Sequence, residues 1–419
     1  MEARVSDVMM GSFGQRQFRS CAGSAPLTPT SATVSLAPSR TEALRSAKAQ
    51  ATWASNPAKG RKELSSQQNI ERRRSLLLIV ITLIAMLFSV STFGATDEAV
   101  SPKAKDSVDR ALRWLKDHQS PDGTFPQGES AGSTAVPSLA VMAFLARGHV
   151  PGQGPYGQLL YKSIDYVLDS QQPDGLLSRS QGGNHVMYEH GIATVMLSEV
   201  YGMVDDARRV KIAHALSRSV KLILDAQKAP KSAPQYEGGW RYQVNSPDSD
   251  ISVTGWQLMA LRGAANCGAA VPKAALEAGR EYIRRSAVPT GGFGYQPGGG
   301  PNQARSGTGI LSLELLGEHD SKEALAAGEF LLKNQPDNPG IEFYYYAVYY
   351  CSQAVNQLGG TYWDTIYPRL CNTLMSEQQP DGSFGGGNGQ EQEAGPAYRS
   401  AMACLALCVP FRYLPLYQK

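Results

Sequence analysis

The stretch "QQPDGSFGGG", Gln378 to Gly387, is the last of three nearly identical phrases in the chain. The earlier copies read "QSPDGTF" from Gln119 and "QQPDGLL" from Gln171. The first glutamines are 52 and then 207 residues apart, and the second interval is close to four times the first. This spacing predicts a repeat with three degenerate copies between Gln171 and Gln378.

Turn-rich segments that end in an aromatic residue occur near the expected positions. They are "YEGGW", "PTGGFGY" and, more weakly, "NQPDNPGIEF". The six closing residues are Phe125, Leu177, Trp240, Phe293, Phe343 and Phe384. Their successive spacings are 52, 63, 53, 50 and 41 residues. Because one such unit cannot bury its apolar face alone, the units are expected to pack on one another.

Two different helix patterns flank each turn. Before the turn, "VDRALRWLKDHQ" and "LYKSIDYVLDSQ" place apolar residues at i, i+3, i+4 and i+7, which predicts amphipathic helices. After the turn, the segments are apolar or small almost all round, which is typical of helices buried on every side. These segments are "VPSLAVMAFLA", "GIATVMLSEVY", "VTGWQLMALRGA", "GTGILSLELL" and "YRSAMACLALC". The sequence therefore predicts an inner and an outer helical layer.

The turn itself has a structural explanation. Proline cannot continue the preceding helix, and glycine accepts the positive φ that a chain reversal needs. The glutamine amide can donate to carbonyls left unpaired at the helix end, and the aromatic residue packs beneath the turn. A turn used six times is expected to be scaffold, so function is expected where the copies differ.

The repeated pattern Q-x-x-D-G-x-W/F between paired helices resembles the QW motif of the squalene-hopene cyclase and protein prenyltransferase superfamily. The resemblance covers residues 100–416. It implies an all-α fold, an (α/α)6 toroid of six helical hairpins in which inner helices line a central cavity. Cyclases, prenyltransferases, cobalamin carriers and complement thioester domains share or resemble this toroid, so the motif specifies the fold better than the function.

The class II cyclases of this superfamily carry an Asp-x-Asp-Asp motif whose middle acidic residue protonates an alkene or an epoxide. In "PDSDISVTGWQ", Asp248 and Asp250 match the first two acidic positions and Ile251 replaces the third. The resemblance therefore implies Asp250 as general acid with Asp248 as its partner, in a protonation-initiated polyprenyl cyclisation without a metal.

Physical chemistry gives these two aspartates two interpretations. Two carboxylates in one apolar cavity cannot both ionise cheaply, so one keeps its proton at a raised pKa. However, both residues precede an apolar helix, where aspartate is a favoured N-cap and the helix dipole lowers its pKa. The sequence is therefore compatible with both roles of these aspartates, as catalytic acid and as helix cap.

The sequence lacks the residues that two related activities require. Protein prenyltransferases hold zinc with Asp, Cys and His late in the chain, whereas the last histidine is His319 and "EAGPAYRSAMACLALC" offers no such set. The Gly-Cys-Gly-Glu-Gln thioester sequence is also absent. Squalene cyclases use two helical barrels, and this chain has residues for one. No cofactor and no metal are expected.

Aromatic residues supply further cavity candidates. The run "IEFYYYAVYYC" is the densest aromatic patch, and on a helix Tyr345 and Tyr349 share one face while Tyr346 and Tyr350 share the next. Facing a cavity, Tyr345, Tyr349 and Trp256 could stabilise carbocations or stack on sugar rings or isoprenoid chains. Packing between the helix layers is the alternative.

Polar residues at the starts of the inner helices are the remaining candidates. In "GGNHVMYEHG", Glu189 and His190 follow His185, and a His and a Glu at i,i+4 can form an acid–base pair or half a metal site. Capping and surface hydrogen bonding are the alternatives.

Four more charged residues lie at comparable places. Glu237 and Arg241 flank "GGW" and are expected to form an ion pair, while Arg305 and Arg399 stand at later helix starts. Several inner-helix starts should ring one mouth of the toroid, so a ligand is expected there.

The N-terminal 95 residues differ from the rest. They hold 12 of the 40 basic and 5 of the 37 acidic residues, which leaves 28 and 32, so the repeat region is mildly acidic and has no basic stripe for nucleic acid. Residues 1–70 are predicted to be a disordered extension. Residues 72–95 contain the apolar run Leu76 to Phe88 after three arginines, which predicts a signal peptide or a membrane anchor with the toroid outside the cytoplasm.

The cysteines do not form a disulfide framework. Cys21 precedes the apolar run and five remain, an odd number. Cys404 and Cys408 are at i,i+4 on one helix face, which favours core packing.

The sequence thus leads to three functional hypotheses. The first is a terpenoid cyclase-like protein acting on a hydrophobic or isoprenoid small molecule. The second is a non-catalytic toroid that binds a hydrophobic ligand, a peptide or a protein partner. The third is a carbohydrate-active toroid using Glu189 or Glu237 with Asp250, which needs two carboxylates about 5 to 10 Å apart across a cleft.

Overall fold

A computed structural model describes residues 101–125, 133–180, 185–387 and 389–418 of the chain. All of them belong to the compact unit Ser91–Lys419, and the predicted extension (1–70) and apolar segment (72–95) lie outside them. Within the described ranges, none of the helices combines the length and apolar character needed to cross a membrane.

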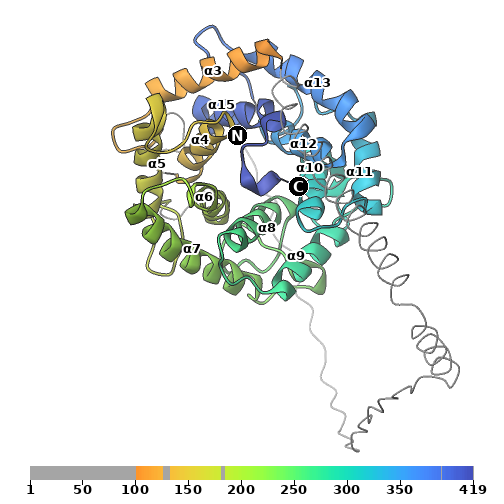
Figure 1. Cartoon of the computed structure of the whole chain (residues 1–419). Helices are drawn as coiled ribbons and strands as arrows, with labels where there is room; N and C mark the ends of the chain where they lie inside the picture. The colour runs from red at the N-terminus through yellow and green to blue at the C-terminus, as the bar shows by residue number, and fades with distance from the viewer. Residues whose placement is uncertain (1–100, 126–132, 181–184, 388, 419) are drawn as a thin grey trace, which may run out of the picture. The chain divides into compact units, whose positions relative to one another are not determined.

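The helices of this unit alternate between an outer and an inner layer (Figure 1). The outer helices are α3 (Pro102–Asp117), α5 (Gly157–Asp169), α7 (Asp206–Gln227), α9 (Lys273–Arg285), α11 (Lys322–Lys333) and α13 (Gly360–Glu377). The inner helices are α4 (Ala135–Ala146), α6 (Val186–Val200), α8 (Ile251–Asn266), α10 (Gln303–Leu315), α12 (Tyr344–Leu358) and α15 (Gly395–Leu407). Short elements complete the unit: η2 (Gly154–Tyr156), η3 (Pro234–Tyr236), β1 (Phe293–Gly294), β2 (Pro301–Asn302), α14 (Gln390–Glu393), η4 (Val409–Phe411) and η5 (Pro415–Tyr417).

The inner helices form a closed ring. Each one packs against the next along the chain, and α15 packs against α4. The outer helices surround this ring, and α13 returns to α3. The all-α toroid expected from the repeat is therefore confirmed.

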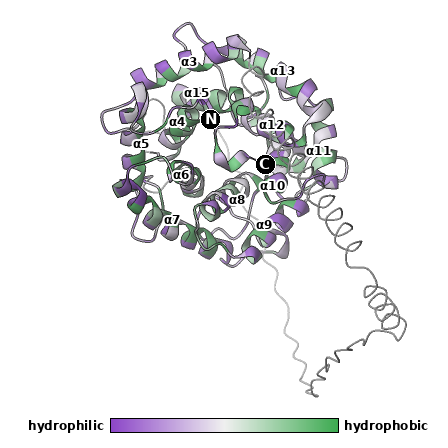
Figure 2. Cartoon of the chain, viewed as in Figure 1, coloured by the Kyte–Doolittle hydropathy of each residue, from purple (hydrophilic) through white to green (hydrophobic). Residues whose placement is uncertain are grey.

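The two layers follow the two helix patterns. Helix α4 is buried at all of its residues except Ala135, because it is packed between the outer layer and the other inner helices. Outer helices such as α9 bury one stripe and turn charged residues outward. In Figure 2 the outer helices accordingly alternate between green and purple.

The glutamine of the repeated turn joins successive outer helices. The Nε2 of Gln171 donates to the carbonyl of Gly175 in its own turn and to that of Ala215 in α7, both at 3.0 Å. Gln227 bonds in the same way to Gly238 and to Ala275 of α9. Each glutamine amide therefore fixes its turn against the next outer helix. The glutamine was expected only to cap the end of its own helix.

The last copy of this glutamine closes the ring. Gln378 Nε2 donates to the Gly382 carbonyl at 2.9 Å and to the Ser107 carbonyl of α3 at 2.8 Å. Its Oε1 accepts from Ser107 Oγ at 2.8 Å. The end of α13, the last outer helix, is thereby tied to α3, the first described helix.

In five of the six copies, the closing residue is buried beneath its turn, as predicted. Phe125, Leu177, Trp240, Phe293 and Phe384 are each at most 3% exposed. The copy at Phe343 differs. Phe343 precedes α12 with φ of 53°, is half-buried and lines a cavity. In its segment "NQPDNPGIEF" the glycine, Gly340, stands three residues before the aromatic residue and does not have a positive φ, so the turn has a different shape.

The C-terminal segment enters the ring, as the position of the C-terminus in Figure 1 shows. The Tyr417 hydroxyl hydrogen-bonds to that of Tyr349 in α12, and the Leu416 N–H donates to Glu199 Oε1 in α6 at 3.0 Å. The other oxygen of Glu199 is buried without a hydrogen-bond partner. Burial raises the pKa of Glu199 to about 8.

The five cysteines of the described part are free thiols. Cys404 and Cys408 are buried on α15, as expected for core packing.

Replacing the glycine of a turn should destabilise the ring by crowding. At Gly175 (φ 101°) an added Cβ would lie 2.8 Å from the Arg218 carbonyl oxygen of α7, whereas Gly268 (φ 87°) faces open space. Gly175→Ala should therefore cost about 1–3 kcal/mol more than Gly268→Ala, which carries the same backbone strain. Urea unfolding followed by circular dichroism measures both, and equal losses would contradict the proposed clamp.

Glu199 should make stability depend on pH. Its pKa rises from 4.5 to about 8 on folding, so the folded state holds a proton that the unfolded chain releases. The free energy of unfolding should fall as pH rises from about 4.5 to about 8, by at most about 1.4 kcal/mol per pH unit. The variant Glu199→Gln should lose this part of the dependence in thermal unfolding at a series of pH values. Identical pH profiles for both proteins would show that the buried carboxyl does not titrate as described.

Candidate functional site

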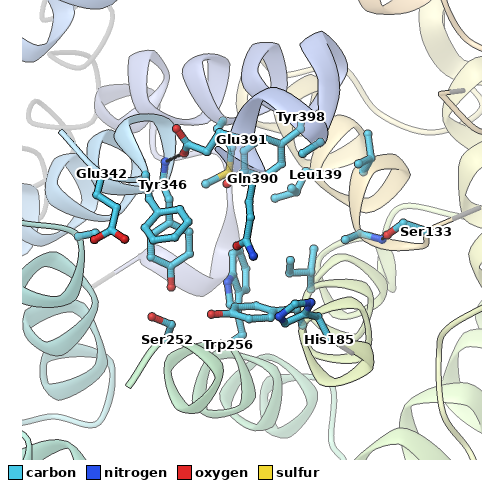
Figure 3. A pocket seen from close by; sticks show the side chains of 18 of the residues that line it. Ser133, Leu139, His185, Ser252, Trp256, Glu342, Tyr346, Gln390, Glu391 and Tyr398 are labelled. Atoms are coloured by element: carbon cyan, nitrogen blue, oxygen red, sulfur yellow. Dashed lines mark hydrogen bonds between the residues drawn. The ribbon is translucent and has the colours of Figure 1, made fainter. Parts of the chain in front are cut away.

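A cavity of about 450 Å³ lies where the inner helices begin. Its lining comes from the N-terminal ends of the inner helices and from the segments that lead into them (Figure 3). The lining residues are Ser133, Ala135, Val136, Leu139, His185, Tyr188, Ile192, Tyr242, Ser252, Trp256, Tyr295, Asn302, Ala304, Arg305, Glu342, Phe343, Tyr346, Gln390, Glu391, Ala394, Tyr398 and Met402. The expectation that inner-helix starts converge on one mouth thus matches the geometry.

Aromatic side chains dominate the lining. Tyr188, Tyr242, Tyr295, Tyr346 and Tyr398 are each half-buried. Trp256 also lines the cavity, and its indole stacks on the ring of Tyr349 with centroids 5.8 Å apart and planes 7° apart. Such a wall offers π faces to an apolar chain, to a sugar ring or to a cation.

Arg241 lies behind the tyrosine side of this wall. Its guanidinium is 4.8 Å from the Tyr242 ring and 5.3 Å from the Tyr295 ring. Arg241 Nη1 is 2.7 Å from Asp248 Oδ2, so the ion partner of Arg241 is Asp248 and not Glu237. The expected Glu237–Arg241 pair is wrong, because a hydrogen bond between the backbones of Trp240 and Asp250 brings Asp248 back beside Arg241.

Asp250 is both a helix cap and a perturbed acid. Its Oδ1 accepts from the N–H groups of Ser252 and Val253, both at 2.9 Å, at the start of α8. Its Oδ2 is buried without a hydrogen-bond partner, 4.0 Å from Arg241 Nε. Burial raises the pKa of Asp250 to about 7, against the opposing effects of the two N–H groups and Arg241. Desolvation therefore outweighs capping.

Protein carboxylates and amides already occupy several inner-helix starts. Glu189 Oε2 accepts from the N–H of Thr134, the cap residue of α4, at 3.3 Å. Glu391 accepts from the N–H groups of Tyr345 and Tyr346 in α12 at 3.2 and 2.9 Å. Asn302 Oδ1 accepts from the Arg305 N–H in α10 at 2.9 Å. Several of the inner helices that begin at the cavity are thus capped by side chains of the protein.

Several predicted site residues lie away from the cavity. His190 is fully buried, its Nδ1 accepts from the Leu177 N–H, and its Nε2 lies 3.2 Å from the Ser219 carbonyl; burial lowers its pKa to about 4. Arg399 donates to the carbonyls of Phe384 and Glu391. Glu237 is exposed. None of these residues lines the cavity, and neither does Glu189.

The tyrosine run places a different face toward the cavity from the one predicted. Tyr345 donates its hydroxyl hydrogen to the Gly385 carbonyl at 2.5 Å, and Tyr349 lies beneath Trp256. Tyr346 lines the cavity instead. Of the predicted mouth residues, Trp256 and Arg305 line it, and Asp248 and Asp250 lie close behind.

Other residues that line the cavity were not predicted from the sequence. Tyr242 and Tyr295 follow the third and fourth turns two residues after the closing aromatic, a spacing that could have revealed them. Tyr188 and Tyr398 stand near inner-helix starts, and Glu391 lies in the short helix α14; none of them has a motif of its own. Within the described residues, no cluster of three or more His, Cys, Asp or Glu residues could hold a metal ion.

A family model described as the prenyltransferase alpha-alpha toroid domain matches residues 73–342 and 341–416. The chain belongs to this family. A comparison with curated protein sequences finds no match.

Solved structures share the toroid at low identity. An inactive variant of the alpha-1,6-mannanase GH76A of Salegentibacter sp. HEL1_6, in complex with alpha-1,6-mannotriose, aligns with a TM-score of 0.54 and 11% identity over 74% of this chain and 99% of that one. A glycosidase variant in complex with glucose gives 0.51 and 14%, over 75% and 98%. The type II terpene cyclase MstE from Scytonema, in complex with merosterolic acid A, gives 0.45 and 13%, over 75% and 98%. At such low identity, the mannanase and the glycosidase show that the fold is shared and nothing more.

Removing the charge of Asp248 should lower the pKa of Asp250. Asp248 neutralises Arg241, so Asp248→Asn leaves the guanidinium to stabilise the ionised form of Asp250. Infrared titration of the protonated carboxyl band that Asp250→Asn abolishes should give a midpoint below the wild-type value of about 7. An unchanged midpoint would mean that Arg241 does not act on Asp250.

Proposed function

We propose that the chain is a terpenoid cyclase-like protein whose ring cavity binds an unsaturated isoprenoid chain and whose Asp250 starts cyclisation by proton transfer. The observation that carries the proposal is the buried Asp250 carboxyl, which has one oxygen without a hydrogen-bond partner next to an aromatic cavity. A general acid works best when its pKa lies near the working pH, and the pKa of Asp250 is about 7.

The lining suits the apolar part of such a ligand. Leu139, Ile192 and Met402 supply aliphatic surface, and Trp256 and Tyr346 supply aromatic faces. The volume of about 450 Å³ falls within the usual range of small-molecule pockets.

The reaction is an isomerisation. The proton of Asp250 adds to one carbon of a double bond, whose π electrons form the new C–H bond and leave a carbocation on the other carbon. A second double bond of the same chain attacks this cation and forms the ring C–C bond. The final cation loses a proton from a neighbouring carbon, and the Asp250 carboxylate takes a proton back. Trp256 and Tyr346 stabilise the cations through their π faces.

Access to the acid needs one local movement. Asp250 lies behind the lining residues Ser252 and Tyr295: its Oδ1 accepts from the Ser252 N–H, and the neighbouring Ile251 N–H donates to the Tyr295 carbonyl. We propose that the bound chain displaces one of these side chains and so meets Oδ2. In this proposal Asp248 holds Arg241 through an ion pair. Asp248 does not share a proton with Asp250.

A second candidate function is glycoside hydrolysis in the same cavity. The carboxylates first predicted for it, Glu189 and Glu237, do not line the cavity, but Glu342 and Glu391 do. Aromatic faces such as Trp256 also bind sugar rings by stacking.

Replacing Asp250 should stop cyclisation and leave binding intact. The amide of Asp250→Asn keeps the capping oxygen and has no acidic proton, so turnover of geranylgeraniol or squalene by purified protein should fall at least about 100-fold. Gas chromatography of the products measures turnover, and calorimetry measures binding. Glu237→Gln, at an exposed position, is the matched control.

Three outcomes decide between the functions. Unchanged turnover in Asp250→Asn would overturn the catalytic assignment. Tight binding without conversion by the wild type would instead identify a non-catalytic carrier of hydrophobic ligands. Release of sugar from alpha-1,6-mannotriose in parallel reactions would favour the glycosidase.

A further inference from the structure

The starts of the inner helices are the places where an anionic ligand would normally bind. Unpaired N–H groups and the positive end of the helix dipole attract phosphates and carboxylates there. At α8 and α12, those positions are already taken. Asp250 accepts from the first N–H groups of α8, and Glu391 accepts from those of α12. Two carboxylates of the protein thus hold the sites that a phosphate would use.

The charges that line the cavity do not replace this lost attraction. Among the described lining residues, Arg305 is the one lysine or arginine, and Glu342 and Glu391 are acidic. Arg305 Nη2 lies 3.9 Å from Glu342 Oε2, and its guanidinium is 5.3 Å from the Tyr295 ring. Burial and the nearby Arg241 lower the pKa of His185, so this ring is neutral at neutral pH.

Arg399, which follows the lining residue Tyr398, is engaged by the backbone: it donates to the carbonyls of Phe384 and Glu391. Behind the wall, Arg241 is already paired with Asp248. A diphosphate needs several cationic donors to offset the loss of its hydration, and none is left unmatched among the described lining residues.

The remaining polar groups are neutral. Gln390 reaches toward the middle of the cavity, and Ser133 and His185 lie across from it (Figure 3). Asn302 uses its Oδ1 as a helix cap, which leaves its amide N–H₂ as a donor. Amide, hydroxyl and imidazole groups match a ligand that both donates and accepts hydrogen bonds without a charge.

We propose that the isoprenoid taken by this cavity carries an uncharged hydrogen-bonding head group, such as a hydroxyl, and that diphosphates are excluded. This inference rests on the proposed function, since it names the substrate class of the same site. Excluding diphosphates fits a reaction that begins by protonating a double bond and not by losing pyrophosphate.

The test compares two ligands that differ only in the head group. Calorimetric titration of the purified protein with geranylgeraniol and with geranylgeranyl diphosphate, at equal ionic strength, should show the alcohol binding at least about tenfold more tightly. Glu342→Gln removes a lining negative charge and should strengthen diphosphate binding several-fold with little change for the alcohol. Glu237→Gln, which removes an exposed negative charge away from the lining, should change neither affinity.

The outcomes separate this inference from the proposed function. Equal or tighter binding of the diphosphate by the wild type would overturn the inference and leave isoprenoid binding in place. The same response of Glu342→Gln and Glu237→Gln would also overturn it, since the effect would then be one of net charge. Failure of both ligands to bind would overturn the isoprenoid function and this inference together.

Discussion

The architecture depends on a primary amide that donates two hydrogen bonds in two directions. The glutamine at the end of an outer helix bonds to the glycine carbonyl of its own turn and to a carbonyl of the next outer helix. The turn glycine must also lack a side chain, because its Cα faces the backbone of that next helix. Together they fix both the distance and the rotation between neighbouring hairpins. The helices can then vary in sequence while their starts keep meeting at one end of the ring.

That convergence creates the chemical environment of the site. Helix starts bring unpaired N–H groups together in a poorly solvated space, and the chain satisfies several of them with Glu189, Asp250, Asn302 and Glu391. At Asp250, the helix favours the ionised form and burial favours the protonated form, and burial is the stronger effect. The same residue is therefore a helix cap whose pKa is raised by burial, so the two interpretations of its sequence context are compatible.

The sequence was sufficient for the scaffold and for part of the site. Period, turn chemistry and the two helix patterns are local, so the repeat predicted the toroid and the burial of Phe125 or Trp240. Rotation of each inner helix is not local. A tyrosine run such as "YYYAVYY" has aromatic residues on every face, and only packing in the ring decides that Tyr346, and not Tyr345, meets the cavity. The partner of Arg241 depended on a backbone bridge across a loop, and His190 Nε2 meets the carbonyl of Ser219 in α7, which belongs to the next hairpin. Such contacts between segments leave no mark in the spacing of residues.

Closure of the ring by Gln378 and Ser107 also bears on how the chain acquires its structure. These residues are 271 positions apart, so their hydrogen bond forms only after nearly the whole domain has been synthesised. Until then the growing chain is an open arc whose two ends expose apolar helix faces that the finished ring covers. Assembly of the hairpins is sequential and local, whereas the final step joins the most distant parts of the polymer and is expected to be slow. The hydrogen bond between Tyr417 and Tyr349 in the ring centre likewise joins segments far apart in sequence, 68 residues from one another.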